Sequence, residues 1–274
     1  MGTIYHQWPK IDLHRHLEGS LRMETIYELS RKLRLPFPYH DNNLFRSMFA
    51  FDNNDERTLK KFISKFINIR KLIRDREILA KITYESLADA ALDNVVYVEL
   101  RFNYMAMING GLSPREIIGG INEGIRIAKN DFEIETGLIC GISRDMNIEC
   151  AEETVNFAIS NIDNGIIAID LMNDESFSPE LFQAPFERAR RAGLYATAHA
   201  GEAGDAGNII KCINLLGAQR IGHGTQILKN AESLSAAREH NILVECCLTS
   251  NMQTGAIETL SDHPLPALLD CKIP

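Results

Sequence analysis

The chain alternates short apolar runs with longer segments whose apolar positions recur at helical spacing. The runs are rich in β-branched residues and are bounded by glycine, asparagine and other polar residues, which is typical of strands. Seven runs have this character: IDLH (11–14), NVVYVELRF (94–102), EIETGLICGIS (133–143), GIIAIDL (165–171), GLYATAH (193–199), QRIGH (219–223) and NILVECC (241–247). Because strands that alternate with helices form repeated βα units, the pattern predicts an α/β fold with a parallel sheet.

Two of the intervening helices begin with recognisable capping residues. The segment SPRE (113–116) has the pattern of an N-cap, a first-turn proline and a capping-box acid, and SPE (178–180) opens another helix similarly. No linker or low-complexity stretch divides the chain. We therefore expect a single domain over residues 1–274.

The connection between the first two runs, residues 15–93, is unusually long for a βα loop and helix. It contains three helical patterns, METIYELSRKL (23–33), TLKKFISKFINIRKLI (58–73) and REILAKITYESLADAAL (76–92). We interpret it as a helical insertion at about residues 21–92. For most of this insertion we expect ordinary packing of its helices against the sheet. The functional alternative is that part of it forms a lid over a pocket.

Composition limits the class of protein and its partners. The 274 residues are 45% hydrophobic and 24% charged, with a formal net charge of -8. These values are typical of a soluble globular protein, and the negative charge argues against a nucleic-acid partner. The chain start has no secretory pattern, no run reaches transmembrane length, and the six cysteines lack C-x-x-C spacing. We expect a cytoplasmic protein with reduced cysteines and no membrane partner; an oligomer is compatible with the sequence.

Two histidines stand one residue apart at the end of the first run, in KIDLHRHLEGS (10–20). Side chains alternate faces along a strand, so His14 and His16 point the same way and Arg15 points the other way. Paired neutral imidazoles suit a metal, but hydrogen-bonded or surface histidines are equally common. A catalytic zinc site needs further ligands from elsewhere in the chain.

Half of the eight histidines stand at the ends of expected strands: His14, His16, His199 and His223. In a (βα) barrel the chemistry gathers at these strand ends, so we expect the four side chains to converge. The other four fall in terminal, loop or helical segments, where exposed or capping roles are expected: His6, His40, His240 and His263.

An acid lies close to the third of these strand-end histidines. Glu202 follows His199 by three residues in a glycine-containing turn. A carboxyl group beside a metal-bound water can move protons. The alternative is a role at the start of a helix expected near Asp205, where acids are favoured. The nearby histidine favours proton transfer.

These motifs resemble the signatures of the adenosine deaminase family of zinc-dependent purine deaminases, within the amidohydrolase superfamily. The resemblance is carried, in order, by LHRHLEG (13–19), HAGE (199–202), RIGHGT (220–225) and LTSNMQTGA (248–256), and extends to VVYVELR (95–101), DLMNDE (170–175) and HPLPALLD (263–270). It implies a TIM-type (βα)8 metal-dependent hydrolase barrel.

The resemblance implies one zinc ion held by His14, His16 and His199, which lowers the pKa of a bound water. Glu202 would protonate the purine ring nitrogen beside the amino-bearing carbon. His223 would orient the water and help take its proton, after which hydroxide adds to the ring and ammonia leaves. The fourth expected strand lacks the lysine that two-metal relatives use as a bridge, which favours a single metal.

The family also implies substrate contacts from His16, Glu18 and Asn173. Glu18 stands where family members place an acid near the sugar. That acid is usually Asp in adenosine deaminases, and Glu occurs in adenine deaminases and in some bacterial adenosine deaminases. Asn173 replaces a glycine whose backbone amide meets the purine, and Met172 is also bulkier than usual. A salt bridge for Glu18 and a loop role for Asn173 are the alternatives.

The end of the chain departs from the family pattern. Members continue into an eighth strand that ends in Ser-Asp followed by Asp or Asn and Pro, where the first Asp binds zinc. The segment SDHP (261–264) directly precedes a helical pattern instead, so we expect Asp262 to be that helix's N-cap. The eighth strand is therefore expected to be missing. Three explanations are open: the chain is truncated, a partner chain closes the gap, or this chain is a degenerate copy.

Two classes of function follow from the sequence. The first is hydrolytic deamination of a 6-aminopurine nucleoside, with adenosine or deoxyadenosine giving inosine-type products and ammonia, and with adenine or aminofutalosine as alternative substrates. The second is a truncated, non-catalytic metal-binding paralogue that keeps the ligands but lacks a completed site.

Overall fold

The computed structural model describes residues 4–52 and 54–274, which divide into two compact units. The first unit comprises the described residues of Met1–Asn53, Ser64–Ile139 and Asp163–Gly165. The second comprises Asn54–Ile63, Cys140–Ile162 and Ile166–Pro274. A single domain over the whole chain stays a prediction.

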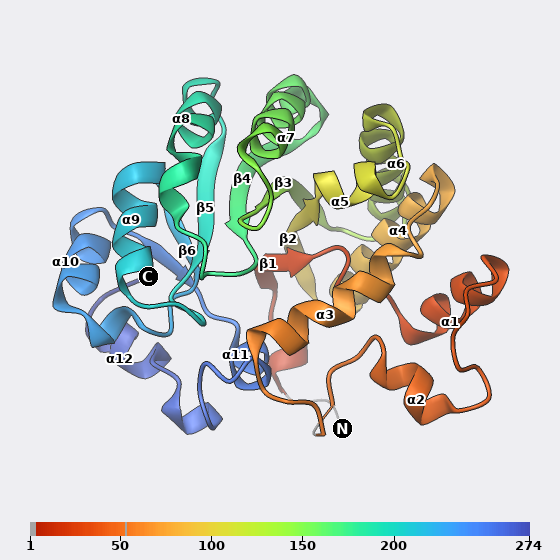
Figure 1. Ribbon diagram of the computed structural model, residues 1–274, viewed down its shortest axis with the longest axis horizontal. Coiled ribbons are helices and arrows are strands. Elements are labelled where there is room, and N and C mark those ends of the chain that lie inside the picture. The colour runs from red at the N-terminus through yellow and green to blue at the C-terminus, as the bar shows by residue number, and fades with distance from the viewer. Residues whose placement is uncertain (1–3, 53) are drawn as a thin grey trace. The chain divides into compact units, whose positions relative to one another are not determined.

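Seven strands form one sheet in chain order, and all seven expected strands are confirmed (Figure 1). They are β1 (Lys10–His16), β2 (Val95–Asn103), β3 (Glu135–Ser143), β4 (Ile166–Met172), β5 (Tyr195–Ala200), β6 (Arg220–His223) and β7 (Leu243–Glu245). The strand β1 pairs with β2 in parallel, and β4 through β7 pair successively in parallel. Residues 4–52 and 54–274 contain no eighth strand.

The first unit carries most of the expected insertion, which is helical as predicted. Its helices, one of which begins in the second unit, are α1 (Met23–Lys32), α2 (Asn42–Ser47), α3 (Leu59–Arg70), α4 (Arg76–Leu92), α5 (Tyr104–Asn109) and α6 (Pro114–Asp131). The helices α4 and α6 pack closely because α6 has glycine at the contact. A Cβ on Gly124 would lie 2.5 Å from the backbone oxygen of Ala80 and 2.6 Å from Cβ of Thr83. The predicted capping box between Ser113 and Glu116 is confirmed.

In the second unit, helices cover the strands that carry the later motifs. They are α7 (Ile148–Ser160), α8 (Gln183–Arg191), α9 (Gly207–Leu216), α10 (Ala231–Glu239), α11 (Leu248–Gln253) and α12 (Leu265–Asp270). The helix α7 packs on β4, and both α8 and α9 pack on β5, as Figure 1 shows. The expected start at Ser178 is confirmed, although it opens a 3-10 turn (Pro179–Phe182) that runs directly into α8. The remaining short 3-10 turns are Ile4–Gln7, Ile162–Asn164, Ile227–Lys229 and Leu260–Asp262.

The expectation that Asp262 is the N-cap of α12 is wrong. Its carboxylate instead accepts hydrogen bonds from the backbone N–H (2.9 Å) and the hydroxyl (2.8 Å) of Thr259, closing a capping box on the 3-10 turn. The start of α12 is served by His263, whose Nδ1 accepts the N–H of Leu265 at 3.0 Å. His263 therefore has the capping role expected of it, but it is buried rather than exposed.

The six cysteines are free thiols that differ in accessibility. Cys140 and Cys212 are buried, and burial raises the pKa of Cys212 to about 11, so its thiol is protonated at neutral pH. We expect iodoacetamide to label Cys150 and Cys271 in the folded protein while Cys140 and Cys212 react only after unfolding in urea. Peptide mass spectrometry measures this, and native labelling of Cys212 as fast as Cys150 would contradict it.

No helix in the described part of the chain is both long and apolar enough to span a membrane.

Candidate active site

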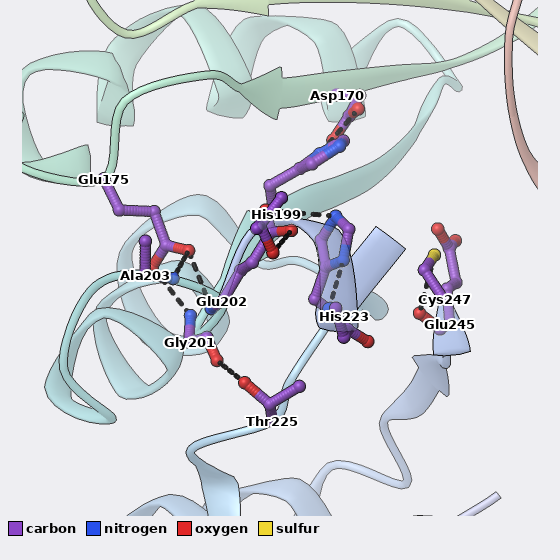
Figure 2. A network of polar contacts seen from close by, with 12 residues as sticks. Asp170, Glu175, His199, Gly201, Glu202, Ala203, His223, Thr225, Glu245 and Cys247 are labelled. Carbon is purple, nitrogen blue, oxygen red and sulfur yellow. Dashed lines mark hydrogen bonds and ion pairs between the residues drawn. The ribbon is translucent and has the colours of Figure 1, made fainter. Parts of the chain in front are cut away.

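His199, near the end of β5, is held by a buried carboxylate on the neighbouring strand. Its Nδ1 lies 3.1 Å from Oδ2 of Asp170 in β4, and the Asp170 side chain is fully buried. Figure 2 shows this pair at the top of the polar network. A histidine that is bonded through Nδ1 to a carboxylate has Nε2 left to bind a metal, which is the usual arrangement of metal-ligating histidines.

The buried carboxylate of Glu175 holds the backbone N–H groups of the loop after β5. It accepts three successive backbone N–H groups, from Gly201 at 2.7 Å, Glu202 at 2.8 Å and Ala203 at 3.2 Å (Figure 2). A Cβ at Gly204 would lie 2.7 Å from Oε2 of Glu175, so this close approach needs glycine there. The backbone that carries Glu202 is therefore set by Glu175.

Replacing Glu175 by alanine is expected to lower the free energy of unfolding by at least about 2 kcal/mol, since two buried N–H groups lose their acceptor. Urea unfolding followed by circular dichroism measures the change. The control is Glu180→Ala, which removes an exposed acid paired with Lys211 and should cost no more than about 1 kcal/mol. Equal effects of the two substitutions would contradict the assignment.

Glu202 itself is a buried carboxyl group between a hydroxyl and an imidazole. Its Oε1 accepts a hydrogen bond from the Thr254 hydroxyl at 3.0 Å, and its Oε2 lies 3.4 Å from Nε2 of His223. Burial raises the pKa of Glu202 to about 7, so the group can hold or release a proton near neutral pH. It does not cap the helix α9, where Asp205 accepts the first N–H instead.

His223 ends β6 in a left-handed backbone conformation, with φ of 68°. Its ring lies 5.0 Å from the ring of His199, centroid to centroid. Its Nδ1 contacts the side-chain nitrogen of Asn251 at 3.0 Å. The second unit thus brings together two histidines predicted at strand ends, His199 and His223, and Glu202, which was predicted in the turn after His199.

In the first unit, the two histidines of β1 lie on the same side of the strand, as expected. The rings of His14 and His16 are 5.3 Å apart, centroid to centroid, while Arg15 bonds the carboxylate of Asp12 at 2.8 Å. Glu18 is buried, and its Oε1 accepts the backbone N–H of Asn103 at 2.8 Å. Burial raises the pKa of Glu18, against the lowering effect of that hydrogen bond.

Asn173 follows β4 with φ of 74°, a conformation that favours glycine. Its side-chain Nδ2 donates to Oγ of Ser143 at 2.5 Å, so the side chain is engaged with the end of β3. A loop role for Asn173 therefore has a physical basis, and its contact with substrate stays a prediction.

Each unit contains a pair of neighbouring histidines that could bind a metal, His14 and His16 in the first unit and His199 and His223 in the second. The sequence predicts His14, His16 and His199 as ligands and His223 as a catalytic residue. Neutral imidazoles are suitable zinc ligands. The roles of the individual histidines, including His16, stay predictions.

The sequence analysis assigned several buried residues of this network no role in the active site, although it noted the motifs that contain them. These residues are Asp170, Glu175, Asn251, Thr254 and His263. Asp170 could have been found from the sequence, because it is a charged residue near the end of an expected strand, where site residues of a (βα) barrel gather. The reach of Glu175 into the loop after the next strand, and the meeting of two segments at Asn251, depend on tertiary structure and had no such signal.

Comparison with known proteins identifies relatives over nearly the whole chain. A family model described as adenosine deaminase matches residues 9–274. An adenosine deaminase of Clostridium botulinum (strain 657 / Type Ba4) is 38% identical over 273 residues, covering 98% of this chain and 82% of the relative.

Solved structures of related proteins agree in fold. The adenine deaminase of Arthrobacter aurescens superposes with a TM-score of 0.89 at 27% identity, covering 97% of this chain and 80% of that one. Arabidopsis ADAL, solved with IMP, gives 0.87 at 30% identity over 98% and 80% of the two chains. An amidohydrolase from Burkholderia ambifaria, solved with bound Zn, gives 0.86 at 27% identity over 98% and 74%. The predicted TIM-type α/β fold, with seven strands in this chain, is confirmed.

Proposed function

Because the chain belongs to the adenosine deaminase family, we propose that it catalyses zinc-dependent hydrolytic deamination of a 6-aminopurine nucleoside, with adenosine or deoxyadenosine as the preferred substrate. The observation that carries this proposal is the buried Glu202 carboxyl group, with a pKa of about 7, in contact with His223. A proton donor of this kind is what addition of water to an aminopurine ring requires.

His14, His16 and His199 would hold one zinc ion. The pairing of His199 with Asp170 supports this role, because a carboxylate on Nδ1 orients Nε2 and makes it a stronger ligand. The closeness of the His14 and His16 rings in the first unit, 5.3 Å between centroids, supports it as well. When bound, zinc supplies a Lewis acid that makes water acidic enough to attack near neutral pH.

Glu202 would hold the proton that is delivered to the ring nitrogen beside the amino-bearing carbon, which makes that carbon more electrophilic. His223 would orient the attacking water. Closed packing around Glu202, which is 4% exposed, keeps bulk water from competing for its proton. One proton of the water would restore the Glu202 carboxyl group and the other would pass to the amino group, which leaves as ammonia.

Substrate contacts are assigned to His16, Glu18 and the backbone N–H of Asn173. The buried Glu18 carboxyl group can accept a hydrogen bond from a sugar hydroxyl, which favours a nucleoside. Adenine is the second candidate, because a glutamate at this position also fits family members that deaminate the free base, and the Arthrobacter relative is described as an adenine deaminase. Aminofutalosine is third. We propose a cytoplasmic location and no nucleic-acid or membrane partner.

A substrate panel tests this proposal. Zinc-loaded protein is assayed for ammonia release with adenosine, deoxyadenosine, adenine and aminofutalosine, and kcat/KM is compared. We expect the two adenosine nucleosides to give the highest values. A higher kcat/KM for adenine would overturn the assigned substrate, and zinc-loaded, folded protein inactive on every compound would favour the non-catalytic paralogue.

A further inference from the structure

A chain of hydrogen bonds in the second unit runs from the start of α12 to His223, which in turn contacts Glu202, and the chain has only one consistent direction. Its members are Leu265, His263, Asn251, His223 and Glu202, and the successive contacts are 3.0, 3.2, 3.0 and 3.4 Å. Asn251 is fully buried, and His263 and His223 are each 4% exposed. Buried polar groups of this kind need partners of the correct donor or acceptor type.

The direction is fixed at the backbone. The N–H of Leu265 can only donate, so Nδ1 of His263 accepts and carries no proton. Burial lowers the pKa of His263, which keeps its ring neutral. A neutral imidazole has one N–H, so Nε2 of His263 carries the proton and donates to Oδ1 of Asn251 at 3.2 Å.

The orientation of Asn251 then determines the state of His223. With Oδ1 turned to His263, the amide nitrogen Nδ2 of Asn251 faces Nδ1 of His223 at 3.0 Å and donates to it. Nδ1 of His223 therefore has a lone pair, and the proton of the neutral ring is on Nε2. That N–H faces Oε2 of Glu202, which is an acceptor when ionised.

We infer that Asn251 and His263 are positioning residues that hold His223 in the Nε2–H tautomer, so that His223 presents a hydrogen-bond donor to the reacting groups. In this tautomer Nε2 has no lone pair for a metal or for another proton. His223 is therefore a donor beside the zinc site and not one of its ligands, and it orients the attacking water without taking the water's proton, the second role that the family resemblance implies. The expected effect of these residues on catalysis rests on the proposed function. The tautomer of His223 is inferred from the hydrogen bonds alone and does not depend on that function.

Nitrogen-15 NMR of the zinc-loaded protein labelled at histidine tests the tautomer directly. We expect the Nε2 resonance of His223, assigned by its loss in His223→Gln, to have the shift of a protonated nitrogen and the Nδ1 resonance that of an unprotonated one. A protonated Nδ1, or the shift of a metal-bound nitrogen at Nε2, would overturn the inference. This readout needs no enzymatic activity.

Variants at the two positioning residues supply the second test. Asn251→Asp replaces the donor by an acceptor, so the His223 proton should move to Nδ1 and kcat/KM should fall by roughly 10- to 100-fold with zinc retained. His263→Leu should also lower kcat/KM relative to the wild type. His263→Gln keeps a hydrogen-bond donor toward Asn251, so its kcat/KM should lie between those of His263→Leu and the wild type. The control Asn156→Asp adds the same charge on the exposed face of α7 and should change neither quantity.

The outcomes separate this inference from the proposed function. An Asn251→Asp protein that folds but keeps the wild-type His223 tautomer and activity would overturn the inference alone. If Asn251→Asp does not fold, the wild-type spectrum decides. A wild-type protein with the Nε2–H tautomer but without deaminase activity would overturn the proposed function and leave the positioning of His223 intact.

Discussion

Glu202→Gln is expected to lower kcat/KM for aminopurine deamination by about 10²- to 10⁴-fold, while zinc content and folding are retained. Glutamine keeps the volume of the side chain and can still accept the Thr254 hydroxyl, which lies 3.0 Å from Oε1 of Glu202. It cannot hold a transferable proton, and burial that raises the pKa of Glu202 to about 7 is what fits the native group for this task. Steady-state ammonia release measures the loss.

The control for this variant is Glu180→Gln, which makes the same chemical change at an exposed acid paired with Lys211. Its kcat/KM should equal that of the wild type. Wild-type activity in a zinc-loaded Glu202→Gln protein would remove Glu202 from the mechanism, since no other proton donor is assigned to that role.

The second large effect is expected on metal binding. His199→Ala should remove most of the zinc, of which the native protein is expected to hold about one ion per chain. The loss should exceed the roughly 10- to 100-fold fall in affinity expected for Asp170→Asn, which keeps the ligand but weakens its orienting partner. Elemental analysis after dialysis against a weak chelator measures both variants.

His240→Ala is the matched control for metal loss, because His240 is an exposed histidine at the end of α10. It should bind zinc like the wild type. Zinc retained in full by His199→Ala would show that His199 is not a ligand. Equal loss of zinc from His240→Ala would show that the loss does not depend on His199 and would also contradict the assignment.

Most of the fold was predictable because the strands are buried and therefore apolar. Runs such as GIIAIDL and GLYATAH are almost continuously apolar, as expected of strands that are covered on both faces. The first run forms β4 and the second forms β5. Helix starts were predictable where capping is local, as at Ser113. The cap assigned to Asp262 failed because the competing partner, Thr259, sits only three residues away and forms its own turn.

The candidate site was predictable to the extent that its residues stand at strand ends. His199 and His223 were found in this way, and the second unit does bring their rings together. The residues that position them were not found, because Asn251 and His263 act through contacts between segments that no local pattern encodes. His263 is the clearest case, since a histidine beside a proline in a loop suggests exposure and this one is buried.

The most direct test of the central claim is ammonia release from adenosine by the chain loaded with zinc, compared with the same protein after the metal is removed by a chelator. We expect inosine and ammonia in equal amounts from the zinc-loaded protein, loss of the reaction on chelation, and its return when zinc is added back. A folded, zinc-loaded protein that releases no ammonia from adenosine or from any other 6-aminopurine would contradict the assignment of this chain as a deaminase.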